Sequence, residues 1–191
     1  MRGAGLAASV FVLAIGSPTI AGLKAANRSP TKVTNNAQPA SDLWASVRYL
    51  VGDWLGEGNG KPGEGSGSFS FRFDLGENVL VRRNHSEYPA SDGKPAIVHD
   101  DLMVCYPDPA GGRILAIYFD NEGHVIHYVV ETDEGGRLVL VSEANPSSPG
   151  FRLTYTKLVG DTVGVKFEIA PPGRADFVPY LTGKATRVPK P

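Results

Sequence analysis

This sequence of 191 residues contains a single cysteine and has almost no net charge. Its single cysteine, Cys105, excludes an intramolecular disulfide framework and any zinc or iron–sulfur site built from several cysteines. Lys and Arg number 19 against 20 for Asp and Glu, so there is no electrostatic case for a nucleic-acid partner. The 41% hydrophobic content is enough for a packed core and argues against a disordered chain.

Familiar catalytic and nucleotide-binding motifs are missing too. The chain contains no Gly-x-Ser-x-Gly, no phosphate-binding loop and no dinucleotide fingerprint leading into a helix. Cys105 stands between Val104 and Tyr106, a setting typical of a buried small side chain rather than a nucleophile. The sequence therefore assigns no catalytic residue and no cofactor, and an enzymatic role is the less favoured interpretation.

The first residues have the pattern of an export signal. Arg2 precedes an apolar run, residues 4–20, and the small residue Ala21 follows it. This pattern is typical of a secretory signal peptide over residues 1–21, with cleavage after Ala21 or, as an alternative, after Ala25. The run is shorter than the ~20 uninterrupted apolar residues that span a bilayer, so we expect no stable membrane span.

Residues 22–40 contain few large apolar side chains and show no usable period. Such a composition predicts a disordered linker. We therefore expect an exported protein, periplasmic or secreted, whose folded part begins near residue 41.

Glycine and proline, by contrast, are abundant and separate a series of strand-like segments. Gly 23 and Pro 15 make up about a fifth of the chain, against a usual share of about 12%. Residues 69–73, 151–155 and 163–169 alternate apolar and polar side chains, which is the period of a half-buried strand. Further β-rich runs cover residues 54–58, 79–88, 97–106, 113–120, 124–131, 137–143 and 177–188.

The turns between these runs are short, and this decides the architecture. Short connections join antiparallel neighbours, because parallel strands need crossovers of about a dozen residues or more. About ten strands in simple succession leave two exposed edges unless the sheet closes on itself. The sequence therefore predicts an all-β, up-and-down antiparallel barrel of about ten strands over residues 41–188.

A short N-terminal helix is predicted ahead of the first strand. Ser41 and Asp42 can cap it, and Gly52 is well placed to end it. The apolar residues between them form one stripe at helical spacing. They are Leu43, Trp44, Val47, Leu50 and Val51.

The segment Gly52-Asp53-Trp54 follows this helix and opens the first strand of the meander. The arrangement resembles the calycins, the superfamily of lipocalins and fatty-acid-binding proteins. The resemblance implies that Trp54 closes one end of the barrel and packs under a basic residue from the last strand. Arg187 is the natural counterpart, with Lys184 as the second choice.

Two narrower resemblances point to calycin relatives. Residues 106–109 and 117–125, with their aromatic, aromatic, Asp and Gly-His pattern, resemble an uncharacterised bacterial family of calycin-like domains, over about residues 43–188. The Leu-x-Gly-x-Trp-x-Gly-x-Gly of residues 50–58 is similar to the opening of the haem-binding nitrobindins. Nitrobindins ligate iron through a histidine near the C-terminus, but no histidine follows His127 here, so we expect no haem.

The candidate ligand site is placed on the central strands. Arg82 and Arg83 point to opposite faces, and the face of Arg83 and His85 is favoured as lumenal because apolar Val79 and Val81 extend it. The calycin resemblance implies that a lumenal arginine or tyrosine holds a ligand carboxylate. The predicted ligand-binding residues are Arg83, His85, Tyr118 and Tyr155, with Tyr128 as a further ring facing the cavity.

Histidines paired with carboxylates offer the main alternative chemistry. His99 and Asp101 are two residues apart and so share one face of a strand, as do His85 and Glu87. Such pairs can bind a metal or supply an acid and a base, although a polar pair on the barrel wall is the commoner case. His124 and His127 are expected on opposite faces, and no local set reaches three ligands, so no metal site is predicted.

Three functions remain open at this point. The favoured one is binding of a small apolar or amphipathic ligand in the lumen. The alternatives are a hydrolase or isomerase that uses His and Asp groups in the same cavity, and a ligand-free structural or interaction domain. In the last case the barrel is filled by its own aromatics, Phe69, Phe71, Phe73, Tyr155 and Phe167. Residues 115–117 and 128–130 are apolar on both faces, so their outer face packs on the N-terminal helix or a partner, or forms the surface of a homodimer.

Overall fold

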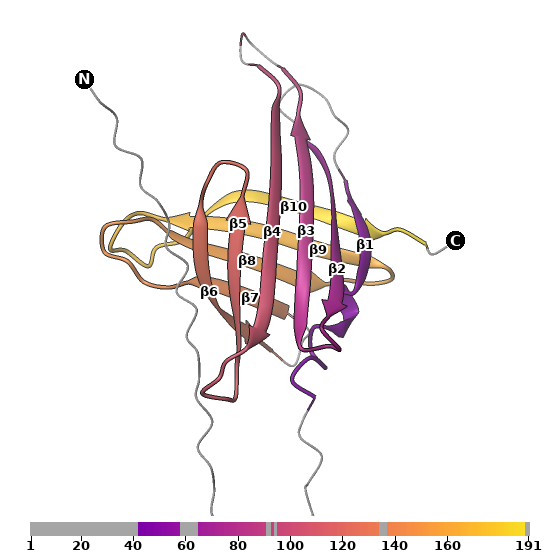
Figure 1. Cartoon of the computed structure of the whole chain (residues 1–191). Coiled ribbons are helices and arrows are strands. Elements are labelled where there is room, and N and C mark those ends of the chain that lie inside the picture. The colour runs from indigo at the N-terminus through magenta and orange to yellow at the C-terminus, as the bar shows by residue number, and fades with distance from the viewer. Residues whose placement is uncertain (1–41, 58–64, 91–92, 94, 134–136, 190–191) are drawn as a thin grey trace, which may run out of the picture. The chain divides into compact units, whose positions relative to one another are not determined.

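The computed structural model describes residues 42–57, 65–90, 93, 95–133 and 137–189. In this part of the chain ten antiparallel strands follow one another around a closed barrel (Figure 1), which confirms the predicted all-β architecture. The strands are β1 (Gly52–Gly56), β2 (Ser66–Asp74), β3 (Val79–Tyr88), β4 (Ile97–Pro107), β5 (Ile114–Asp120), β6 (Val125–Thr132), β7 (Arg137–Ser142), β8 (Gly150–Lys157), β9 (Thr162–Ala170) and β10 (Val178–Arg187).

The predicted signal peptide and linker, residues 1–40, lie outside the described residues. Among the residues that are described, no helix is long and apolar enough to cross a membrane. The homodimer expected from residues 115–117 and 128–130 stays a prediction.

Pairing of β1 with β10 closes the barrel and brings Trp54 opposite Arg187. The guanidinium carbon of Arg187 lies 4.3 Å from the centre of the Trp54 ring, which is the contact that the calycin resemblance implies. Arg187 also donates hydrogen bonds to the carbonyl oxygens of Val51 and Tyr49, at 2.6 and 2.5 Å. Gly52, at φ 142°, leaves the space that this guanidinium occupies. One basic side chain thus ties the last strand to the chain entering the first.

The predicted short helix is reduced to turns and one 3₁₀ helix, η1 (Arg48–Leu50). Asp42 does cap the segment, since its Oδ1 accepts a hydrogen bond from the Trp44 backbone at 3.0 Å; Ser41 lies outside the described residues. The apolar stripe is also real, because Trp44, Val47 and Leu50 are all buried. Helices shorter than ~12 residues have little stability of their own, so packing of these side chains into the barrel end decides the local geometry.

Aromatic rings fill the part of the lumen behind η1. Phe69 and Phe71 from β2 meet Tyr155 from β8 across the barrel, with ring centres 5.7 and 5.4 Å apart. Trp54 stacks on Phe69 at 6.0 Å. Phe73 contacts Trp44 rather than Tyr155, at 5.6 Å. The end of the barrel beside η1 is therefore closed and packed.

Among the described residues, no side chain closes the opposite end. Along β10 the inward positions change from buried to exposed, since Ala185 is 1% exposed and Leu181 is 40% exposed. Between them, a Cβ built at Gly183 would have no described atom within 4 Å. We call this end, where β3 ends and β10 begins, the mouth of the barrel.

Candidate functional site

The structure places Arg82, not Arg83, inside the barrel. Arg82 pairs across the sheet with Phe71 and Met103, both fully buried, and is itself only 6% exposed. Arg83 points outward and is exposed. The preference for Arg83 as the lumenal arginine was therefore wrong. That prediction was based on the apolar residues Val79 and Val81, which share a face with Arg83. Their side chains point outward too, and they are half-buried there.

His85 shares the outer face with Arg83 and so does not reach the lumen. Its Nδ1 lies 2.7 Å from Asp100 Oδ1 and its Nε2 lies 3.0 Å from Glu87 Oε1. Hydrogen bonds to Asp100 and then Glu87 raise the pKa of His85 above its ordinary value. The expected pairing of His85 with Glu87 is present, but on the outside of the barrel. Of the four predicted ligand residues, the lumen contains Tyr118 and Tyr155.

An ion pair between Arg82 and Asp101 lies at the centre of the polar interior. Arg82 donates to Asp101 through Nη1, and both side chains are buried. Burial raises the pKa of the Asp101 carboxyl, and the nearby Arg82 and His99 oppose that rise. The guanidinium carbon also lies 5.7 Å from the Phe69 ring centre and 6.0 Å from that of Tyr155. One charged side chain is thus surrounded by an aromatic cluster.

Two atoms in this interior lack a hydrogen-bond partner. Among the described residues, neither the Nε of Arg82 nor the hydroxyl of Tyr155 has one, although both are buried. Buried polar groups in folded proteins are nearly always paired, so an unpaired one calls for a bound water or ligand. The two atoms come from opposite walls, β3 and β8, of the same region, where nearby Arg82 opposes the rise that burial gives the pKa of Tyr155.

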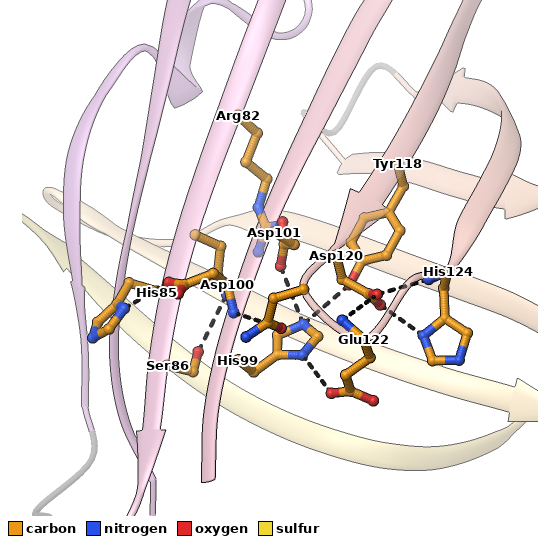
Figure 2. A network of polar contacts seen from close by, with 12 residues as sticks. Arg82, His85, Ser86, His99, Asp100, Asp101, Tyr118, Asp120, Glu122 and His124 are labelled. Atoms are coloured by element: carbon orange, nitrogen blue, oxygen red, sulfur yellow. Dashed lines mark hydrogen bonds and ion pairs between the residues drawn. The ribbon is translucent and has the colours of Figure 1, made fainter. Parts of the chain in front are cut away.

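A hydrogen-bonded network runs from this pair to the mouth (Figure 2). The ring of His99 lies between Glu122 and the Tyr118 hydroxyl, with both contacts 3.0 Å long. Its Nε2 is also 3.5 Å from Asp101. Tyr118 in turn donates to Asp120 at 3.3 Å. The predicted same-face pair of His99 and Asp101 is therefore present, and it faces inward.

The network ends at the turn between β5 and β6. Asp120 Oδ2 lies 2.8 Å from His124 Nδ1, and its Oδ1 accepts the His124 backbone N–H at 2.9 Å. His124 is thus part of the network, whereas His127 on β6 is exposed, and the two histidines do not meet. No group of three or more His, Cys, Asp or Glu side chains among the described residues is arranged to hold a metal.

Apolar side chains form the other half of the mouth. Phe151 and Phe167 stack with ring centres 5.9 Å apart, and Tyr180 packs edge-on against Phe167 at 6.1 Å. Leu181 pairs across the sheet with Phe167 on the same face. The mouth therefore has a polar wall on β3 to β5 and an apolar wall on β8 to β10.

An open groove of about 650 Å³ lies elsewhere, on the outer face of β1 to β5. Most of its lining residues point away from the lumen, such as Arg83, Leu102 and Phe119. They alternate along the strands with inward-facing residues that also line the groove, namely Trp54, Phe69, Asn84, Asp101 and Asp120. Neither Arg82 nor Tyr155 lines it. Its size is that of a small-molecule pocket, but it is not the lumenal cavity that the sequence led us to expect.

Cys105 lies deep in the interior on β4 and takes no part in this network. Burial raises the pKa of its thiol to about 12, so it stays protonated and unreactive at neutral pH. This is the small buried side chain that the sequence indicated.

The chain matches no protein-family model and no curated protein. The closed ten-stranded antiparallel barrel is compatible with a calycin-like fold. A shared barrel does not establish a function, which has to be argued from the residues of the site.

Proposed function

We propose that this protein binds a small amphipathic molecule in the mouth of its barrel, with the polar end of the ligand directed toward Arg82 and Tyr155. One observation carries the proposal: open space and an unpaired buried hydroxyl occur in the same transverse row of the barrel. Gly183 pairs with Val165, and Val165 pairs with Tyr155. Two strand spacings, about 10 Å, separate the open position from the hydroxyl-bearing residue.

The energetics favour a ligand that reaches this row. A buried hydrogen-bonding group without a partner costs about 1–3 kcal/mol, and the described residues contain two such atoms, on Arg82 and Tyr155. A ligand oxygen that contacts both would recover part of that cost. Its apolar portion would lie against Phe151, Phe167 and Leu181, whose remaining exposed surface would then leave water.

The two walls of the mouth explain why an amphipathic ligand fits better than a purely apolar one. Asn84, Ser86 and His99 occupy inward positions of β3 and β4 on the polar wall. Ligand sites commonly combine a mainly apolar surface with a few oriented polar groups, which matches this division.

The proposal can be tested by filling the open space beside Gly183 with a larger side chain. Gly183→Leu places a side chain into the space beside Val165 and should weaken binding of the uncharged fluorescent probe N-phenyl-1-naphthylamine at least tenfold. Gly183 has no positive φ and no described atom lies within 4 Å of its Cβ position, so the fold should tolerate leucine. Thr182→Leu is the matched control, because that position faces outward. Equal probe affinity in native protein and Gly183→Leu would contradict the proposal.

A second candidate, acid–base catalysis at the mouth, is favoured by the position of His99. A carboxylate, an imidazole and a hydroxyl follow one another in Glu122, His99 and Tyr118, each 3.0 Å from the next. Burial and then the carboxylates of Asp101 and Asp120 raise the pKa of Tyr118, so its hydroxyl would act as a proton donor. Hydrolysis of a p-nitrophenyl ester that His99→Gln slows about 100-fold, with probe binding retained, would support this role.

We also propose that the protein is exported. The support is the sequence of residues 1–21, in which a basic residue, an apolar run and Ala21 follow in the order of a signal peptide.

A further inference from the structure

We infer that the polar group this site accepts is uncharged, a carbonyl or hydroxyl oxygen, and not a carboxylate. The inference rests on the proposed function, because it concerns the ligand of the same site. It follows from the charges that already surround Arg82.

The positive charge of Arg82 is already neutralised inside the barrel. Asp101 on the neighbouring strand forms a buried ion pair with it, at side-chain exposures of 8% and 4%. A second carboxylate, Asp120, lies next in the same row and is also 4% exposed at its side chain. Among the described residues, the other ionisable groups that face the pair are His99, the thiol of Cys105 and the phenols of Tyr118, Tyr128 and Tyr155.

A ligand carboxylate would therefore enter a region in which the negative charges of Asp101 and Asp120 already balance or exceed the positive charge of Arg82. Two carboxylates, Asp101 and Asp120, face one guanidinium, and His124 at the mouth shares Asp120. Bringing a third carboxylate out of water beside like charges is unfavourable, because Arg82, the one guanidinium that faces the site among the described residues, is already paired with Asp101. An uncharged oxygen avoids this cost.

The unpaired atoms also suit an uncharged oxygen. Arg82 Nε can only donate, and the Tyr155 hydroxyl can donate or accept. Burial raises the pKa of Tyr155 to about 12, so the hydroxyl keeps its proton at neutral pH. A carbonyl oxygen can accept from both groups with its two lone pairs. A ligand hydroxyl can accept from Arg82 and donate to Tyr155.

The experiment compares 2-undecanone with decanoate as competitors for N-phenyl-1-naphthylamine at pH 8, on the full protein. The ketone should bind at least tenfold more tightly than the acid, although their chains are nearly equal. Asp101→Asn removes the neutralising carboxylate and should shift this ratio at least tenfold toward decanoate. Asp100→Asn, on the outer face of the same strand, is the matched control and should leave the ratio unchanged.

A second variant covers the case in which Asp101→Asn does not fold. Tyr155→Phe should weaken 2-undecanone about tenfold and leave the probe, which has no oxygen, unaffected. Decanoate binding as tightly as the ketone to native protein, or a ketone affinity unchanged by Tyr155→Phe, would overturn this inference alone. Failure of both compounds to displace bound probe would overturn the inference and the lumenal site together.

Discussion

The guanidinium carbon of Arg82 lies 6.0 Å from the centre of the Tyr155 ring, and each residue leaves one buried polar atom without a partner among the described residues. The two side chains come from β3 and β8, on opposite walls of the barrel. An interior built only for stability would pair these atoms or replace them by apolar groups. Their presence beside an open row of the lumen is the basis of the ligand-binding proposal.

Tyr155→Phe separates stability from binding. Removing an unpaired hydroxyl should leave the free energy of unfolding unchanged or raise it by about 1 kcal/mol, because a desolvated group is lost without a hydrogen bond. Urea unfolding measures this. Tyr49→Phe is the matched control, since that hydroxyl donates to the Tyr155 carbonyl at 3.4 Å and its loss should destabilise slightly. A loss of 2 kcal/mol or more, roughly the full cost of a buried pairing, would show that the Tyr155 hydroxyl has a structural partner.

Trp54→Ala should be among the most destabilising single changes. The ring is buried, stacks on Phe69 and lies under Arg187, so its removal should cost about 3–5 kcal/mol of unfolding free energy. Its neighbour Leu55 is 59% exposed, and Leu55→Ala should stay within about 0.5 kcal/mol. Comparable losses for the two variants in denaturant unfolding would show that Trp54 does not close the barrel.

The buried carboxylate of Glu168 should make the free energy of unfolding depend on pH in the acidic range. Arg152 donates two hydrogen bonds to Glu168, at 2.7 and 2.9 Å, and Lys166 lies 3.0 Å away. These contacts, that of Arg152 foremost, lower its pKa from 4.5 to about 2. A lowered folded-state pKa stabilises the fold above the unfolded value, and this contribution disappears as pH falls from about 4.5 to about 2.

Glu168→Gln should therefore be less stable than the native protein at pH 7, and the difference should shrink as the pH approaches 2. Thermal unfolding followed over this pH range measures it. Glu131→Gln, on an exposed position of β6, serves as the control and should show no such convergence. A constant difference between Glu168→Gln and native protein at all pH values would contradict the assigned ion pair.

Export makes a direct prediction about the mature N-terminus. Protein purified from its own source should begin between Gly22 and Asn27, because the small residues Ala21 and Ala25 end the two candidate cleavage sites. N-terminal sequencing reads this directly. Intact Met1 in a soluble cytoplasmic fraction would refute it.

The barrel and its closed end could be predicted from the sequence, but which arginine faces the lumen could not. Alternation of residues such as Phe69 and Phe71 gives strand faces directly, and short turns leave only antiparallel neighbours. The contact of Trp54 with Arg187 could be predicted because the Gly52-Asp53-Trp54 segment resembles the opening of the calycin barrels. Arg82 was missed because β3 is apolar on both faces at its start, with Leu80 inside and Val79 outside, so periodicity alone could not orient it.

The network at the mouth could be predicted only in part. His99 and Asp101 share a face by their spacing, and this was visible in the sequence. Glu122 and Tyr118 reach His99 from a turn and a neighbouring strand, so their contribution depends on register, which no local pattern reveals. The prediction of a short helix was wrong because tertiary packing, which the local sequence does not reveal, decides this segment. Trp44 and Leu50 pack into the barrel end, and this outweighs the helical spacing of the apolar residues.

The most direct test of the central claim locates a bound ligand on the barrel. Titration of isotope-labelled protein with 2-undecanone, followed by NMR, should shift the signals of Val165, Phe167, Leu181 and Gly183 at the mouth and leave those of Arg83, Leu102 and Phe119 in place. Shifts confined to the outer groove around Arg83, Leu102 and Phe119 would contradict a lumenal site.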